Sequence, residues 1–238
     1  MKVLCLCPTY GRRASLLENS IQLFLNQTYQ DKTLLLFDDL GTLADTQASI
    51  PSTMLISTNK RCNSVGAKYN IMMEFAYNLY DAVVVIDDDD LYLPNHISSH
   101  VEVLTSHEWS KPSTIISAYH RPPAEEKADG RFHGSVAART KTIRAVGGWI
   151  DTKRATFDQE MLQRLTKHSP PGDPCFHHPP QYVYRWQTSG GGHCSGLMGS
   201  SNWYELYQPD SAVPIPTLVP KLDEDTITTL HNLSIQYQ

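Results

Sequence analysis

The chain has 238 residues, of which 40% are hydrophobic and 19% are charged, as in ordinary soluble globular proteins. Its formal net charge of −5 at pH 7 gives no basic footprint of the kind that nucleic-acid-binding proteins show, although local patches at residues 12–13 and 60–61 stay open. The apolar run at the start is too short for a signal peptide, and no later run approaches the roughly 18 residues of a membrane span. We therefore expect one soluble α/β domain that binds no nucleic acid and has no membrane span.

The cysteines indicate the redox environment. There are five, an odd number, and Cys5 and Cys7 fall within one short strand-like run. We expect their side chains to point to opposite faces of that strand and not to pair. Reduced thiols fit a cytoplasmic location.

The first part of the chain alternates predicted strands with predicted helices. Continuous apolar runs predict strands at 2–7, 32–39, 52–58 and 82–86. Apolar residues at helical spacing predict helices at 13–26 and 65–80. This alternation indicates crossover units in a mostly parallel sheet, in which ligands bind beyond the carboxyl ends of the strands. Polar clusters at 8–12, 38–39, 60–63 and 87–90 should meet at that edge.

The second part of the chain has a less regular pattern. We expect a helix from Pro94 to about Ser106, a strand at 113–120, a polar loop at 121–130 and a strand in an antiparallel half at 131–140. Helices at 140–146 and 157–167 and a strand at 181–186 follow. Prolines and the lack of helical periodicity after Gln208 predict a domain at 1–205 and an extended tail at 206–238.

The segment VVVIDDDDLYLP, residues 83–94, places four successive carboxylates directly after an apolar strand. Two carboxylates about 4 Å apart repel by roughly 4 kcal/mol at an effective dielectric constant near 20, so the cluster requires a cation, protons or water. Mg²⁺ and Mn²⁺ commonly use one or two carboxylates together with substrate phosphates. We expect such a cation site at Asp87 to Asp90; the alternative is a solvated acidic turn before a helix.

Two further groups of residues suggest ligand contacts. Arg61 and Lys68, with the neighbouring Lys60, are candidates to neutralise phosphate oxygens, although basic residues of this kind are usually solvated surface. Gly148 provides a permissive backbone beside Trp149, whose flat apolar face is of the kind on which sugars stack. A buried structural tryptophan is the alternative.

Seven segments occur in one order along the chain: CPTYGRR, NQTYQD, LLLFDD, VGAKYN, VIDDDDLYLPNH, GSVAARTKTIRAVGGW and FDQEMLQRL. As an ordered set they resemble family 2 glycosyltransferases of the GT-A fold, over roughly residues 1–200. The resemblance implies a single Rossmann-like nucleotide-diphospho-sugar transferase domain. Its central sheet would be mixed, mostly parallel and flanked by helices.

The resemblance also implies roles for the acidic cluster. The family's Asp-x-Asp metal motif falls on Asp87, Asp88 and Asp89, with Pro94 in its usual following place. Asp87 would contact the ribose or the metal, Asp88 would belong to the nucleotide site, and Asp89 would hold the metal against the donor diphosphate. Because all four residues are aspartates, a register shifted by one, using Asp90, stays open.

By the same resemblance the nucleotide lies along the first loop. Pro8, Thr9 and Tyr10 would follow the base and ribose, with Arg12 in the same polar cluster. Asp39 would accept a hydrogen bond from the ring N–H of a uracil-like base, a role suited to an ionised carboxylate. UDP is therefore the favoured nucleotide.

Glycosyl transfer with inversion needs a base that takes the proton of the acceptor hydroxyl. The family carries this base on the Asp of a Glu-Asp pair six residues before an Arg-Leu, which matches Asp158 here, with Glu160 as runner-up. The preceding Glu is replaced by Phe157, a departure from the pattern. His193 lies in a glycine-rich segment where related enzymes place a histidine that closes over the metal and diphosphate.

The sequence therefore predicts a metal-dependent, inverting glycosyltransferase that uses Mn²⁺ or Mg²⁺ and a nucleotide diphosphate sugar. Its acceptor would be a carbohydrate or another hydroxyl-bearing molecule, and homo-oligomer formation stays open. The sequence lacks the glycine fingerprints of dinucleotide dehydrogenases and P-loop NTPases. The alternative is a non-catalytic protein of the same fold that binds sugar nucleotides or carbohydrates, suggested by Phe157.

Overall fold

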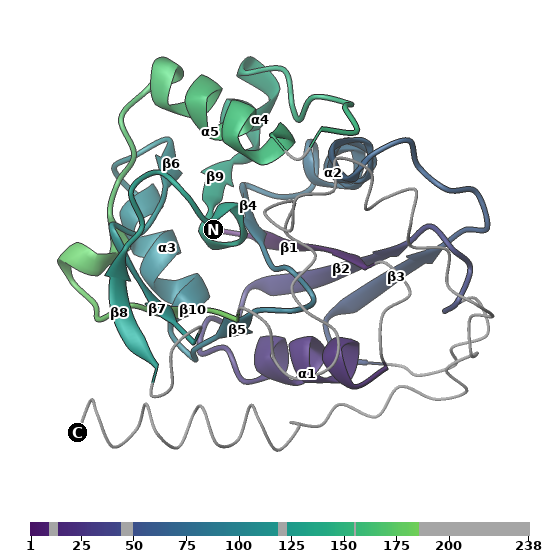
Figure 1. Cartoon of the computed structure of the whole chain (residues 1–238), viewed down its shortest axis with the longest axis horizontal. Coiled ribbons are helices and arrows are strands. Elements are labelled where there is room, and N and C mark those ends of the chain that lie inside the picture. Colours follow the sequence, from purple (N-terminus) through teal and green to yellow (C-terminus); the bar gives the residue numbers. More distant parts are fainter. Residues whose placement is uncertain (10–13, 44–49, 119–122, 155, 186–238) are drawn as a thin grey trace.

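The computed structural model describes residues 1–9, 14–43, 50–118, 123–154 and 156–185. Within these ranges a six-stranded sheet has the order β3-β2-β1-β4-β9-β6 (Figure 1). Its strands are β1 (Val3–Thr9), β2 (Lys32–Asp38), β3 (Thr53–Ser57), β4 (Ala82–Val85), β6 (Trp109–Ser110) and β9 (Ala137–Arg139). The first four named strands are parallel, and β9 runs antiparallel to both of its neighbours. The mixed, mostly parallel sheet predicted from the sequence is confirmed.

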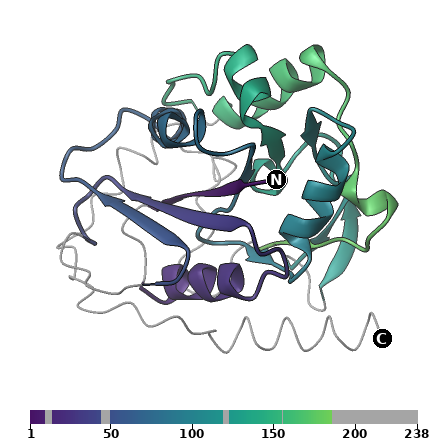
Figure 2. The ribbon, with the colours of Figure 1, turned by 180° about the vertical axis from the view of Figure 1, so that it is seen from behind.

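Helices cover both faces of this sheet, as Figures 1 and 2 show from opposite sides. Helices α1 (Ala14–Leu25) and α3 (His96–Leu104) pack against one face in a core that includes Val3, Ile21 and Leu104. The other face carries α2 (Val65–Ala76), α4 (Thr140–Ala145) and α5 (Phe157–His168), in a second core that includes Leu4, Met72, Ile143 and Leu165. Alternate residues of β1 thus enter opposite cores, because successive side chains of a strand point to opposite faces.

A second, smaller sheet lies beside the first. It has the order β5-β10-β7-β8 and consists of β5 (Leu91–Tyr92), β7 (Thr114–Ser117), β8 (Ala124–Lys127) and β10 (Tyr182–Tyr184). Two 3₁₀ turns, η1 (His133–Ser135) and η2 (Pro174–Phe176), connect the elements of this half. Strand β5 follows the acidic cluster directly, so this sheet holds the chain on the far side of the four aspartates.

Three expectations about the strands of the two sheets were wrong. Cys5 and Cys7 lie in the same core, because residues two apart on a strand share a face. Both are nevertheless free thiols.

The expected loop at 121–130 contains β8, an exposed, charged edge strand without the apolar alternation that marks a half-buried strand. The strand expected at 131–140 is divided between η1 and the short β9. The predicted tail at 206–238 lies outside the described residues.

Candidate functional site

The four aspartates follow β4 at the carboxyl edge of the main sheet. Asp88 and Asp90 are buried and hydrogen-bonded within the protein: Oδ2 of Asp88 accepts from the hydroxyl of Thr9 at 3.0 Å, and Oδ1 of Asp90 accepts from the backbone N–H of Arg185 at 3.0 Å. The hydroxyl of Tyr182 also donates to Asp90. The carboxylate of Asp90 is therefore used in joining the cluster to the smaller sheet.

Asp87 is the half-buried member of the cluster, and its surroundings orient it closely. The Tyr69 hydroxyl donates to its Oδ1 at 2.8 Å, while its backbone N–H donates to the Tyr92 hydroxyl at 2.7 Å. A Cβ at Gly134 would lie 2.6 Å from its Oδ2, so only glycine fits there without a shift. Burial first, and then the charge of Asp87, raise the pKa of Tyr69 well above its ordinary value, which keeps the hydroxyl a donor.

A second group of charges lies at the ends of β1 and β2. The ammonium of Lys68 on α2 contacts Oδ1 of Asp39 at 2.6 Å, and it donates to the carbonyl of Thr9 at 2.8 Å. Oδ2 of Asp39 accepts the backbone N–H of Cys62 at 3.0 Å. Lys68 is 2% exposed, so the alternative of a solvated surface lysine is wrong: the residue joins the ends of β1 and β2 from inside. Burial lowers its pKa, and the charge of Asp39 opposes that decrease.

Aromatic rings connect the acidic cluster to α5. Trp149 stacks on Tyr69 with ring centroids 4.8 Å apart, and its indole N–H donates to Nε2 of His133 at 2.8 Å. Phe157 at the start of α5 lies against both Tyr69 and His133, and its ring centroid is 6.5 Å from that of Tyr69 and 5.9 Å from that of His133. Trp149 is 3% exposed, so the structure favours the buried structural role over the exposed sugar platform. Phe157, which replaces the family's Glu, serves here to dock α5 on the aromatic cluster.

The segment that carries Trp149 is fixed to α2. Asn70 donates to the Trp149 carbonyl at 2.7 Å and accepts its backbone N–H at 2.8 Å. Gly148 has a φ of +67°, and a Cβ there would lie 2.6 Å from Oδ1 of Asn70. The glycine is required by packing and by backbone conformation. Gly148 thus leaves room for the Asn70 side chain that holds the backbone of Trp149 in place.

Asp158 lies in the first turn of α5, one residue after Phe157. Its Oδ1 accepts the backbone N–H of Gln159 at 2.7 Å, and the side-chain amide of Gln159 donates to its Oδ2 at 3.4 Å. Burial raises the pKa of Asp158 above its ordinary value, while these hydrogen bonds and the charge of Lys111 oppose the increase. Glu160 instead accepts from the Thr156 hydroxyl at 3.0 Å, beside the helix start. A carboxylate whose pKa is raised by burial is a feature common at functional sites.

Comparison with known proteins agrees with this geometry. The family model described as "Glycosyl transferase family 2" matches residues 5–110. Residues 5–110 are thus similar to glycosyl transferase family 2. A search of curated proteins gives no significant match. The matched segment contains the acidic cluster, Asp39 and Lys68, whereas α5 with Asp158 lies beyond it.

Solved structures show the same fold. The crystal structure of S. aureus TarS 1-349 in complex with UDP-GlcNAc has a TM-score of 0.64 and 13% identity, covering 81% of this chain and 60% of that one. A second structure of S. aureus TarS 1-349 has a TM-score of 0.61 and 12% identity, covering 78% of this chain and 60% of that one. The chain thus spans 60% of these TarS 1-349 chains, and the expected GT-A fold is confirmed.

The site expected from the sequence is placed only in part. Tyr10, Arg12 and His193 lie outside the described residues. Pro8 and Arg61 are half-buried, and their contacts to a nucleotide stay predictions. The sequence pattern did not identify the residues that orient the cluster from other elements: Tyr69, His133, Gly134 and Tyr182. Only Tyr69 carried a signal, as an aromatic residue on the helix face next to Lys68.

The acidic cluster fits a hard divalent cation by its chemistry. Among the described residues no three His, Cys, Asp or Glu side chains are arranged as a complete metal-binding group. Asp87 and Asp89 nevertheless supply carboxylate oxygens at the sheet edge, and magnesium or manganese sites commonly take their remaining ligands from phosphates and water.

No helix in the described part of the chain is long and apolar enough to cross a membrane.

Proposed function

We propose that this chain is a metal-dependent, inverting glycosyltransferase that moves a sugar from a nucleotide diphosphate to an acceptor hydroxyl. The observation that carries the proposal is the aromatic connection between the two acidic centres. Tyr69 contacts Asp87 through its hydroxyl and Phe157 through its ring, so the end of β4 and the start of α5 are held together. A donor bound at the first centre would present its anomeric carbon toward the second.

Asp158 is the proposed base. As the acceptor oxygen bonds to the anomeric carbon, the hydroxyl proton passes to Asp158, and the bond from that carbon to the diphosphate oxygen breaks with its electron pair on the leaving diphosphate. Attack opposite to the leaving group inverts the anomeric centre. The raised pKa of Asp158 supports this role, because a more basic carboxylate takes a proton more readily.

Asp87 and Asp89 are the proposed ligands of Mn²⁺ or Mg²⁺. The cation would offset the charge that develops on the leaving diphosphate. Tyr69 and Gly134 would hold Asp87 in a single orientation for this purpose. Asp39 is the proposed acceptor for the base N–H. Both of its oxygens already accept one contact, and a carboxylate oxygen has a further lone pair.

UDP is the favoured nucleotide, a proposal supported by the complex of the TarS neighbour with UDP-GlcNAc. The acceptor would be a carbohydrate or another hydroxyl-bearing molecule. A cytoplasmic location is supported by the free thiols of Cys5, Cys7, Cys62 and Cys175.

The test begins with calorimetric titration of UDP and GDP, with and without Mn²⁺, on the wild type and on Asp89→Ala. We expect UDP to bind with metal and the variant to lose this binding. Absence of binding by either nucleotide under all conditions would refute the proposal. Asp158→Asn then separates an enzyme from a binding protein: turnover of the UDP-sugar should disappear while UDP affinity stays unchanged.

A further inference from the structure

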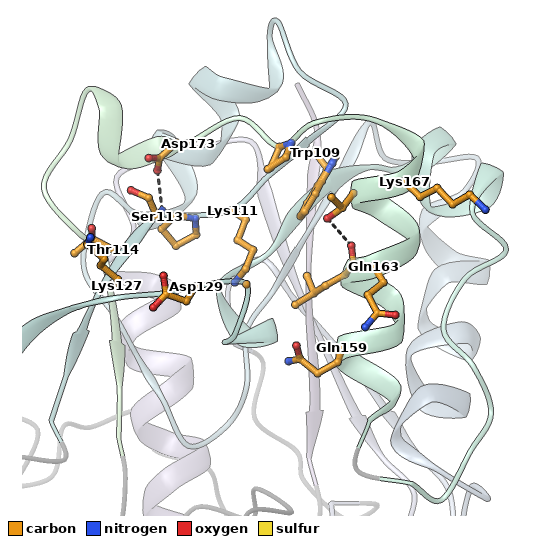
Figure 3. A pocket seen from close by; sticks show the side chains of 15 residues that line it. Trp109, Lys111, Ser113, Thr114, Lys127, Asp129, Gln159, Gln163, Lys167 and Asp173 are labelled. Carbon is orange, nitrogen blue, oxygen red and sulfur yellow. Dashed lines mark hydrogen bonds between the residues drawn. The ribbon is translucent and has the colours of Figure 1, made fainter.

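A pocket of about 900 Å³ lies between α5 and the chain around β6, β7 and β8 (Figure 3). This volume is within the range of about 300–1,000 Å³ found for small-molecule sites. One wall is a face of α5 with residues at helical spacing: Gln159, Leu162, Gln163 and Thr166. The opposite wall is formed by residues 111–114 and by the turn that contains Asp129 and Gly130. None of these residues belongs to the nucleotide or metal site described above.

Lys111 extends into the middle of this pocket in Figure 3, with Asp129 on one side and the two glutamines of α5 on the other. Its side chain is 8% exposed, and its ammonium donates to the backbone carbonyls of Arg131 and Phe132. Within the described part of the chain, no carboxylate forms an ion pair with it. A buried ammonium held only by carbonyl groups is incompletely compensated, and an anionic ligand would supply the missing charge.

The other acidic groups of the pocket do not fill this role. Oδ1 of Asp173 accepts the backbone N–H groups of Ser113 at 3.0 Å and Cys175 at 2.9 Å, so it shapes the wall. Asp129 is exposed in the turn after β8. Burial lowers the pKa of Lys111 to about 8, with the charge of Asp158 opposing and that of Arg131 adding to the decrease. The residue is therefore mainly protonated at neutral pH.

The polar groups around Lys111 suit hydroxyl groups. The amides of Gln159 and Gln163 and the carboxylate of Asp129 provide both donors and acceptors, while Leu162 and Pro171 provide apolar surface. Gln159 also hydrogen-bonds to Asp158 through its side chain. The pocket therefore begins next to the proposed base and continues along α5.

We propose that this pocket binds a sugar that carries a phosphate or carboxylate group, with the anionic group on Lys111 and the hydroxyl groups on Gln159, Gln163 and Asp129. Its place beside Asp158 identifies this ligand as the acceptor, an assignment that rests on the proposed function. The acceptor would thus be an acidic or phosphorylated carbohydrate.

The experiment follows backbone amide signals of the isotope-labelled full chain by NMR during titration with glucose, glucuronate and glucose 6-phosphate. The three probes share one ring and differ mainly at carbon 6, which carries a hydroxyl, a carboxylate or a phosphate. We expect the two anionic sugars to shift the signals of Ser113, Gly130 and Gln163 and to bind at least about tenfold more tightly than glucose. The tighter of the two then identifies the preferred anionic group.

Three variants locate the binding. Lys111→Met should abolish the preference for anionic sugars, and Gln163→Ala, an exposed change with little risk to folding, should weaken all three probes. Lys141→Met is the matched control, because Lys141 is an exposed lysine paired with Glu108 at 2.9 Å and is not among the pocket residues. Equal binding of glucose, or a preference for anionic sugars that survives in a folded Lys111→Met, would overturn the proposal.

The signals also separate this proposal from the proposed function. Shifts confined to the donor-site amides of Cys62 and Asp87 would show that sugar phosphates bind at the nucleotide site, and would refute the pocket assignment. UDP titration in the same samples tests the donor site independently. Normal UDP binding without pocket shifts refutes only the acceptor assignment, and pocket shifts without UDP binding refute only the glycosyltransferase proposal.

Discussion

The hydroxyl of Tyr69 donates to Oδ1 of Asp87 at 2.8 Å and thereby joins α2 to the acidic end of β4. Its ring simultaneously stacks on Trp149 and lies against Phe157. One side chain thus orients a proposed metal ligand by its polar end and the base-bearing helix by its apolar part. The stacking and the hydrogen bond can be separated by mutation.

Tyr69→Phe should keep the stacking and remove the hydrogen bond. We expect about tenfold weaker metal-dependent UDP binding, because groups that orient metal ligands commonly contribute that much affinity. Calorimetry with Mn²⁺ measures it. Tyr77→Phe is the control: Tyr77 follows the same helix, and its ring contact with Arg144 is retained. Equal affinities for Tyr69→Phe and wild type would show that Asp87 needs no such support.

Lys68→Met should strongly destabilise the protein, because it leaves the Asp39 carboxylate buried without its cation. Loss of one member of a buried pair typically costs about 3–5 kcal/mol in the free energy of unfolding. Urea unfolding measures it, and adding Asp39→Asn should recover part of the loss. Lys141→Met, which breaks an exposed pair, should cost at most about 1 kcal/mol. Similar losses for the two lysines would contradict the buried-pair interpretation.

The rate of transfer should depend on pH through Asp158. Because burial raises its pKa, the acidic limb of kcat/KM should lie above the ordinary range of an aspartate. The positive charge of Lys111 favours the ionised carboxylate, so Lys111→Met should move this limb to still higher pH. Lys141→Met, at an exposed lysine outside the pocket, is the control. A limb that stays in place, or moves to lower pH, would show that Lys111 does not act on the base.

Asp158→Asn should abolish transfer and raise Tm at neutral pH. The folded-state pKa is raised above the unfolded value, so the folded protein binds the proton more tightly, and ionisation at neutral pH reduces stability. The neutral amide removes that unfavourable ionisation. The gain should vanish as the pH falls below the unfolded pKa of aspartate, where both states of the wild type are protonated. A lower Tm of Asp158→Asn than of the wild type at pH 7 would contradict this destabilising ionisation of Asp158.

Gly148→Ala should destabilise the protein more than Gly130→Ala. Both glycines have positive φ, +67° and +76°, so both substitutions strain the backbone by about 1 kcal/mol. Only at Gly148 would the new Cβ also meet a side chain, Oδ1 of Asn70 at 2.6 Å, and disturb the contact with Trp149. Urea unfolding of both variants gives the difference. Equal losses would show that Asn70 moves aside freely.

The sequence by itself determined the alternating strands and helices from β1 to β4 and the place of the acidic cluster after β4. Local patterns carry this information: apolar runs mark buried strands, helical spacing marks α2 and α5, and polar residues follow each strand end. The same local patterns did not predict β8, because a charged edge strand lacks apolar alternation. The expectation that Cys5 and Cys7 point to opposite faces was also wrong, because both enter the same core.

The tertiary structure alone decided what surrounds the candidate site. Tyr182 reaches Asp90 across 92 positions of the chain, and Trp149 is tied to Asn70 across 79. Whether a lysine faces a phosphate or a buried aspartate, as at Lys68, depends on such contacts between distant segments. Burial and hydrogen bonding across the fold set the roles of these side chains, and they leave no periodic trace in the order of residues.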